Sequence, residues 1–286
     1  MRKANLFQVF SVVLICTAVE SALTRSKIKL QNNGYTGIVI AINEDIAEDV
    51  AIVNNLQEIF TNASRILHRA TKKRAFFKDI TILLPETWGD SLTSESASGE
   101  TFDTANIIVD KPNGLWGDDP YTNQLGSCGE EGEYIHLTAN FLGDKDWAWK
   151  TFGDPARVLV HEWGHYRWGL FDEYSTGDDN HFYLNDKGHV AVTKCSSHVA
   201  GNALDVRNGK ECNKNPEAGI LPDKYCRYYP DLQKNQATSF TETVVDFCHT
   251  DPNGDPRSFH NAMAPNPQNI HCKYKSAWRS YWKAGK

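Results

Sequence analysis

The chain has 286 residues, of which 40% are hydrophobic and 23% are charged, and its formal net charge is −6. It is long enough to bury one substantial core in one or two domains. No basic run exceeds Lys72-Lys73-Arg74, so the sequence offers no support for nucleic acid as a partner.

Residues 1–22 have the pattern of a signal peptide. Arg2 and Lys3 begin the segment, a mostly apolar stretch follows, and Ser21-Ala22 offers a small-residue cleavage site. The apolar stretch is too short for a transmembrane helix, and no later segment is apolar enough to form one. The sequence therefore predicts a secreted, extracellular product that does not span a membrane, with its folded part in residues 23–286.

The first half of the chain alternates between strand and helix signals. The continuous apolar run Gly37–Ile42 predicts a buried strand. Apolar residues then recur at helical spacing from Ile46 to Ala70, which predicts a long amphipathic helix covering a sheet. Further strands are predicted for residues 79–84, 106–109 and 134–137. We expect the last of these to be an edge strand beside a cleft, to which an extended peptide could add.

The cysteines and one glycosylation sequon fit a secreted chain. Cys16 lies in the predicted signal peptide, and the other six are Cys128, Cys195, Cys212, Cys226, Cys248 and Cys272. Their even number predicts up to three disulfides, whose pairing the sequence does not choose. Five of the six lie in a loop-rich, Cys-rich part of about 171–286, with a short closing helix at 276–282. This part follows a sheet part of about 28–170, which carries the sequon Asn62-Ala63-Ser64 on its long helix.

The most informative motif has the form H-E-x-x-H and begins at His161. Histidines at positions i and i+4, here His161 and His165, lie on one face of a helix, so both imidazoles can reach one ion. Glu162 is then placed to polarise a water molecule on that ion, as in zinc peptidases, where this glutamate is a base and not a ligand. Asp154-Pro155 predicts the start of this helix and Gly169 its end. The alternative is an ordinary surface helix with two histidines and a glutamate.

A catalytic zinc usually has three protein ligands and one open position, so a third ligand is needed. Asp172 is the nearest candidate, because a chain that turns at Gly169 can present it to the ion. This spacing resembles that of the metzincins, which usually have a histidine in third place. More distant glutamates remain alternatives: Glu211, Glu217 and Glu242. Tyr174 is a candidate for stabilising the oxyanion. Metzincins also place a methionine beneath the zinc, and this chain has only Met1 and Met263.

The stretch His161–Tyr174 closely resembles the calcium-activated chloride channel regulator family. Other matching segments are Ile80–Trp88, Val244–Cys248, Ala264-Pro265, Gln268-Asn269, Cys272 and Ser276-Ala277-Trp278. The resemblance runs from about Ile28 onwards and is to the metallopeptidase-like N-terminal part of that family. Members of that family resemble secreted, self-cleaving zinc proteases, and for this chain the resemblance implies a secreted zinc protease with an α+β, metzincin-like fold. By position, it assigns His161, His165 and Asp172 as ligands of Zn²⁺ and Glu162 as the catalytic residue.

Two classes of function follow from these observations. The first is a secreted zinc endopeptidase acting on protein or peptide substrates. The second is a non-catalytic, zinc-stabilised secreted module that binds a chloride channel or extracellular proteins. Glu162 favours the first, because a purely structural site gains nothing from a base. In the full-length family, a von Willebrand A domain, β-sandwich modules and the self-cleavage site come later. Channel regulation and self-cleavage depend on those parts and do not follow from this resemblance.

Overall fold

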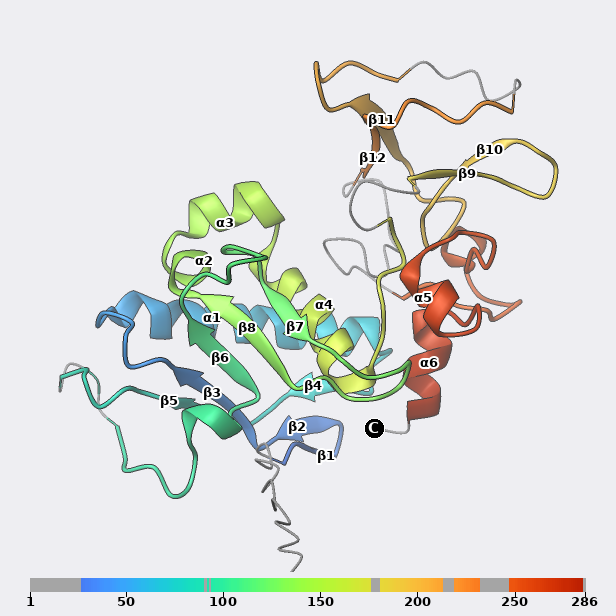
Figure 1. The fold of residues 1–286 in the computed structure, drawn as a ribbon. Helices are drawn as coiled ribbons and strands as arrows, with labels where there is room; N and C mark the ends of the chain where they lie inside the picture. Colours follow the sequence, from blue (N-terminus) through green and yellow to red (C-terminus); the bar gives the residue numbers. More distant parts are fainter. Residues whose placement is uncertain are drawn as a thin grey trace, which may run out of the picture.

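A five-stranded mixed sheet forms the centre of the N-terminal half (Figure 1). The computed structural model describes residues 27–89, 92, 94–175, 181–212, 219–231 and 247–284. The strand order is β5 (Ile80–Leu83), β3 (Ile38–Ile42), β6 (Ile107–Asp110), β8 (Tyr134–Thr138) and β7 (Tyr121–Asn123). The first four strands run parallel and β7 runs antiparallel to β8. The predicted strands are therefore confirmed, and the α+β class with a mixed sheet is correct.

The expectation that residues 134–137 form the edge of the sheet is wrong. β8 pairs with β6 on one side and with β7 on the other, so β7 is the edge strand. Ile135, His136 and Leu137 are buried, as an interior strand requires. The three residues of β7 are all half-buried, without the apolar alternation by which a strand is recognised in a sequence.

The helices α1 (Val50–Ala70) and α4 (Pro155–Trp168) pack on each other and share one apolar core with the sheet (Figure 1). α1 begins at Val50 and not at Ile46, because the Asp49 carboxylate caps it by accepting a hydrogen bond from the Ala51 amide at 2.8 Å. Shorter elements complete this half: β1 (Lys29–Gln31), β2 (Gly34–Thr36), β4 (Phe76–Phe77), η1 (Phe102–Thr104), α2 (Ala139–Gly143) and α3 (Lys145–Phe152). The pair α2 and α3, between β8 and α4, was not predicted.

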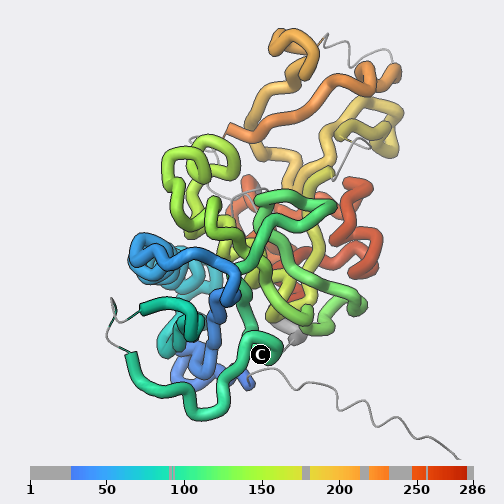
Figure 2. The backbone as a smooth tube through the Cα atoms, turned by 60° about the vertical axis from the view of Figure 1, so that its left-hand side comes forward, coloured from blue at the N-terminus to red at the C-terminus, as the bar shows by residue number. Residues whose placement is uncertain are grey.

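The described residues of the C-terminal half form two hairpins and several short helices. The elements are β9 (Phe182–Leu184), β10 (Val190–Val192), β11 (Gly201–Asp205), β12 (Cys226–Pro230), η3 (Pro256–Ser258), α5 (Pro267–His271) and α6 (Ala277–Ala284). In Figures 1 and 2 the β11–β12 hairpin lies at the far end of the molecule from β1 and β2. The α6 helix contacts α4, which confirms the predicted closing helix.

Three disulfides join the six cysteines outside the predicted signal peptide. The pairs are Cys128–Cys272, Cys195–Cys248 and Cys212–Cys226. The first pair ties the loop after β7 to the end of α5 over a sequence separation of 144. A long closed loop of this kind restricts the unfolded chain most strongly. The number of disulfides agrees with the prediction, and the structure supplies the pairing.

Several predictions concern features that the structure does not test. The signal peptide of residues 1–22, Glu217 and Glu242 lie outside the described residues. The division near residue 170 and glycosylation of Asn62 stay predictions. Asn62 is half-buried on α1, and the hydroxyl of Ser64 is bonded to the backbone of Phe77. Within the described ranges, no helix combines the length and apolar character needed to cross a membrane.

Candidate metal centre

The motif residues lie on α4, whose start is fixed by its own sequence. The Asp154 carboxylate accepts a hydrogen bond from the Ala156 amide at 3.0 Å, and Pro155 occupies the first turn. Apolar residues of the first two turns and the fully buried Trp163 anchor the helix in the core. The helix is therefore a rigid support for side chains on its remaining face.

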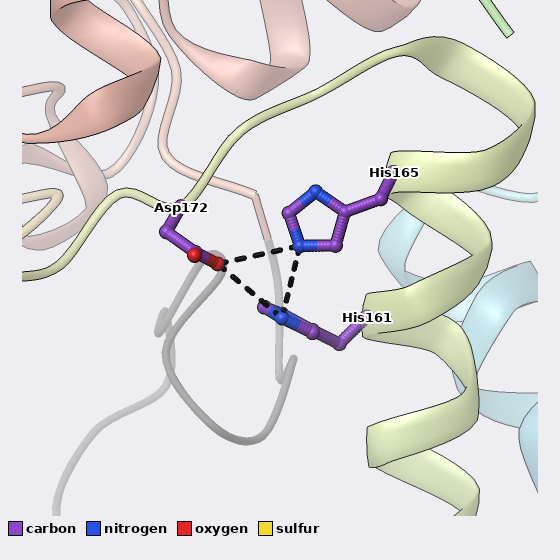
Figure 3. A group of neighbouring side chains, drawn as sticks. All are labelled: His161, His165 and Asp172. Atoms are coloured by element: carbon purple, nitrogen blue, oxygen red, sulfur yellow. Dashed lines mark hydrogen bonds and ion pairs between the residues drawn. The ribbon is translucent and has the colours of Figure 1, made fainter. Parts of the chain in front are cut away.

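His161, His165 and Asp172 converge at one point (Figure 3). The Nε2 atoms of the two histidines are 3.1 Å apart, and the Asp172 Oδ1 atom is 3.3 Å from each of them. Two ligands at zinc distances in a tetrahedral arrangement are about 3.3 Å apart. The three ligand atoms therefore have the mutual spacing that one tetrahedral zinc ion requires.

Asp172 reaches this point because the chain reverses immediately after α4. Gly169 has φ +57°, a left-handed conformation, and its missing Cβ leaves room for the backbone of Glu130. The imidazole Nδ1 of His165 lies 2.6 Å from the carbonyl oxygen of Leu170 in the same turn. If Nδ1 donates to this carbonyl, Nε2 keeps its lone pair for a metal.

The C-terminal segment holds the turn that carries Asp172. The amide of Phe171 donates to Gln268 Oε1 at 2.8 Å, and the amide of Gln268 donates to the carbonyl of Asp172 at 2.9 Å. The neighbouring Glu173 is fully buried, and its Oε1 accepts from the amide of Ala277 at 3.1 Å. We did not predict a positioning role for Gln268 or Glu173. The separation of nearly a hundred residues between the turn and α5 leaves no local signal, although the family resemblance includes Gln268.

Glu162 is buried beside the cluster and oriented by the edge strand. The hydroxyl of Thr122, on β7, lies 2.8 Å from Glu162 Oε2 and 2.9 Å from the carbonyl oxygen of Glu162. The other carboxylate oxygen, Oε1, is 3.8 Å from His161 Nε2. Glu162 is thus adjacent to the three converging atoms without being one of them, as the motif predicts for a base. Thr122 was not predicted as a site residue, because β7 itself was missed.

Burial and the neighbouring charges shift the pKa values of the cluster residues in different directions. Burial lowers the pKa of His161 to about 3, so this imidazole is neutral at pH 7. Burial opposes the charged form of His165, but the adjacent Asp172 carboxylate outweighs this and raises the pKa of His165 to about 9. Burial also raises the pKa of Glu162 to about 7, against the hydrogen bond from Thr122. A metal ion would displace the proton that His165 and Asp172 share.

The other predicted site residues are resolved as follows. Burial raises the pKa of Asp172, but the adjacent His165 and, to the smallest extent, a hydrogen bond from Tyr174 lower it, so Tyr174 contacts this carboxylate and its role towards an oxyanion stays a prediction. Glu211 does not belong to the cluster formed by the described residues. The side chain of Met263 is 55% exposed, so it does not form the buried methionine layer of a metzincin.

The cluster opens into a cleft of about 1010 Å³. The edge strand β7 and Trp116 line one part of the cleft. The cluster of His161, His165 and Asp172 also lines it, as does Tyr174. Residues after β10 and along β12 contribute further lining, including Lys194 and Tyr228. The cleft therefore combines an edge strand, a charged centre and side chains from the disulfide-linked half.

These features define an α+β protein in which an H-E-x-x-H helix and a following aspartate form a group of the metal-binding type. The family model "Calcium-activated chloride channel N terminal" matches residues 28–284. The chain belongs to the calcium-activated chloride channel regulator family, as the sequence resemblance indicated.

Similar proteins agree with this assignment. The chain is 39% identical to calcium-activated chloride channel regulator 1 of Equus caballus over 277 residues, covering 93% of this chain and 29% of that protein. It is 38% identical to regulator 2 of Homo sapiens over 280 residues, covering 94% of this chain and 28% of that protein. The chain thus spans less than a third of the length of these relatives. No solved structure matches the chain.

Proposed function

We propose that this chain is the catalytic part of a secreted zinc-dependent endopeptidase, with a metzincin-like fold. The observation that carries the proposal is the mutual spacing of 3.1–3.3 Å among the ligand atoms of His161, His165 and Asp172, next to a buried glutamate. Two imidazole nitrogens and one carboxylate oxygen suit zinc, whereas calcium and magnesium prefer oxygen ligands alone. Three protein ligands leave one position free for water or substrate.

When bound, zinc would supply Lewis-acid chemistry, polarising the scissile carbonyl and making water more acidic. Glu162 would accept the proton of the attacking water and return it to the leaving amine. A pKa of about 7 suits both transfers at neutral pH. Thr122 fixes one carboxylate oxygen of Glu162 and leaves the other, Oε1, nearest the ligand atoms. In this mechanism Thr122 is a positioning residue.

The substrate would bind as an added strand along β7. This strand is the edge of the sheet and lines the cleft beside Glu162. Peptide groups of an extended substrate can pair with the free edge of a strand, and this brings one peptide bond next to the catalytic group. The substrate class that follows is an extended segment of a protein or peptide.

Secretion is proposed on two grounds. Residues 1–22 have the signal-peptide pattern, and the three disulfides are typical of oxidising compartments. Several relatives carry names that describe them as regulators of a calcium-activated chloride channel. A role towards a channel or other extracellular proteins remains a second proposal for this chain, because it spans less than a third of those relatives.

Metal dependence tests the proposal and separates it from the binding-module alternative. Purified protein is freed of metal with a chelator, and its hydrolysis of a proteome-derived peptide library is followed by mass spectrometry. We expect hydrolysis to disappear and to return with one equivalent of zinc per chain. A protein that binds one zinc, gains thermal stability from it and hydrolyses no peptide would be a zinc-stabilised binding module instead.

A further inference from the structure

One lysine that lines the cleft, Lys194, is not part of the cluster of His161, His165 and Asp172. Lys194 follows β10 and lines the same cleft as Glu162 and β7. Its ammonium group donates a hydrogen bond to the carbonyl of Val199 at 2.6 Å and lies over the ring of Tyr228, 5.1 Å from the ring centroid. The proposed catalytic mechanism does not use this group.

The charge of Lys194 is only partly compensated. An ammonium group has three donors, and the carbonyl of Val199 accepts one of them. Within the described ranges no carboxylate forms an ion pair with Lys194, although the chain as a whole is acidic. Burial lowers the pKa of Lys194 to about 8, so the group is still mostly charged at pH 7. The carboxylate of a bound ligand would stabilise the ammonium charge that burial has desolvated.

The position of Lys194 is fixed in advance of any ligand. The next residue, Cys195, is bonded to Cys248, and the carbonyl of Cys195 accepts a hydrogen bond from the amide of Asn261 at 2.6 Å. The hydroxyl of Tyr228 donates to the same Val199 carbonyl, at 2.7 Å. A cationic group held in this way can select a ligand without losing much side-chain freedom on binding. A solvated surface lysine would have neither the aromatic partner nor the shared carbonyl.

We propose that Lys194 is a specificity-determining residue, which receives the carboxylate of an aspartate or glutamate side chain in a peptide bound along the cleft. This inference rests on the proposed peptidase function, since it names a feature of the same substrate. A charge-assisted hydrogen bond in a half-buried site corresponds to a preference of about tenfold for Glu over Gln.

Paired peptides that differ only by Glu or Gln at each position near the cleaved bond test this inference. We expect the wild type to favour Glu by about tenfold in kcat/KM at one position. Lys194→Met, which keeps the apolar stem, should lose this preference, and Lys194→Glu should favour Lys at that position. Lys210→Glu, the same charge change at an exposed hairpin residue, should keep the wild-type preference. Equal rates for Glu and Gln at every position in the wild type would overturn the inference, as would an unchanged preference in Lys194→Glu.

A binding measurement separates failure of the subsite from failure of the proposed function. The same peptide pairs are titrated against the variant Glu162→Gln by fluorescence anisotropy, with and without Lys194→Met. Absence of cleavage in the wild type would refute the peptidase function alone. About tenfold tighter binding of the Glu peptide, lost on Lys194→Met, would still support the subsite. Equal binding of the Glu and Gln peptides would refute it.

Discussion

Substituting Asp172 by asparagine removes one negative charge from the candidate metal centre and nearly preserves the shape of the side chain. The structure provides a scale for the effect. Burial lowers the pKa of His165, but Asp172 and, to a smaller extent, Glu162 and the Leu170 carbonyl raise it from 6.5 to about 9, a net effect of about 3 kcal/mol for one positive charge. Asp172 is the largest of the influences that raise this pKa, and a zinc ion held by the same oxygen carries two positive charges, so we expect a loss of zinc-binding free energy of similar size. The dissociation constant for zinc should rise by roughly 100-fold or more.

The assay is competition for zinc with a fluorescent chelator at fixed pH, with circular dichroism to verify folding. Asp119→Asn is the matched control, since Asp119 lines the same cleft but is not part of the cluster. It should change the dissociation constant for zinc by less than about threefold, because a solvent-screened charge contributes little. If Asp172→Asn bound zinc as tightly as the wild type, Asp172 would not be a ligand and the assignment would be wrong.

Four further predictions follow from the site and the disulfides. Thr122→Val should lower kcat/KM about tenfold and leave zinc affinity unchanged. The acid limb of its pH–rate profile should move to higher pH, because the hydrogen bond that lowers the pKa of Glu162 is lost. Because the pKa of His165 is about 9 without metal, zinc affinity measured by competition should rise about tenfold per pH unit from pH 7 to 9. In the metal-free protein the same raised pKa stabilises the fold fully below about pH 6.5, and thermal scans should show that contribution lost as the pH rises through about 9. Removing the Cys128–Cys272 disulfide by serine substitutions should lower the free energy of unfolding in urea by about 3 kcal/mol, and an unchanged value would contradict its structural role.

The part of the site that follows from sequence is the part encoded locally. The helical spacing of His161 and His165, the cap at Asp154 and the left-handed turn at Gly169 are each determined by neighbouring residues. The approach of Asp172 follows from that turn. The same holds for the apolar strand β3 and for α1, whose periodicity is strong.

The remainder depends on long-range contacts that leave no local pattern. β7 is three half-buried residues, and only its pairing with β8 makes it a strand and brings Thr122 to Glu162. Gln268 reaches the Asp172 turn from nearly a hundred residues away. The β11–β12 hairpin lies in a segment rich in turn residues, where two short strands are stabilised by their mutual pairing and by Cys212–Cys226. None of these could be predicted from periodicity.

The central claim is that Glu162 acts as a base beside a zinc ion that other residues hold. The most direct test measures zinc content and peptide hydrolysis on the same samples of wild type and Glu162→Gln. We expect both proteins to bind one zinc, and we expect the variant to hydrolyse peptides about 10³-fold more slowly, the range for loss of a general base. If the variant, with its zinc retained, hydrolysed peptides at the wild-type rate, the proposed mechanism would be wrong.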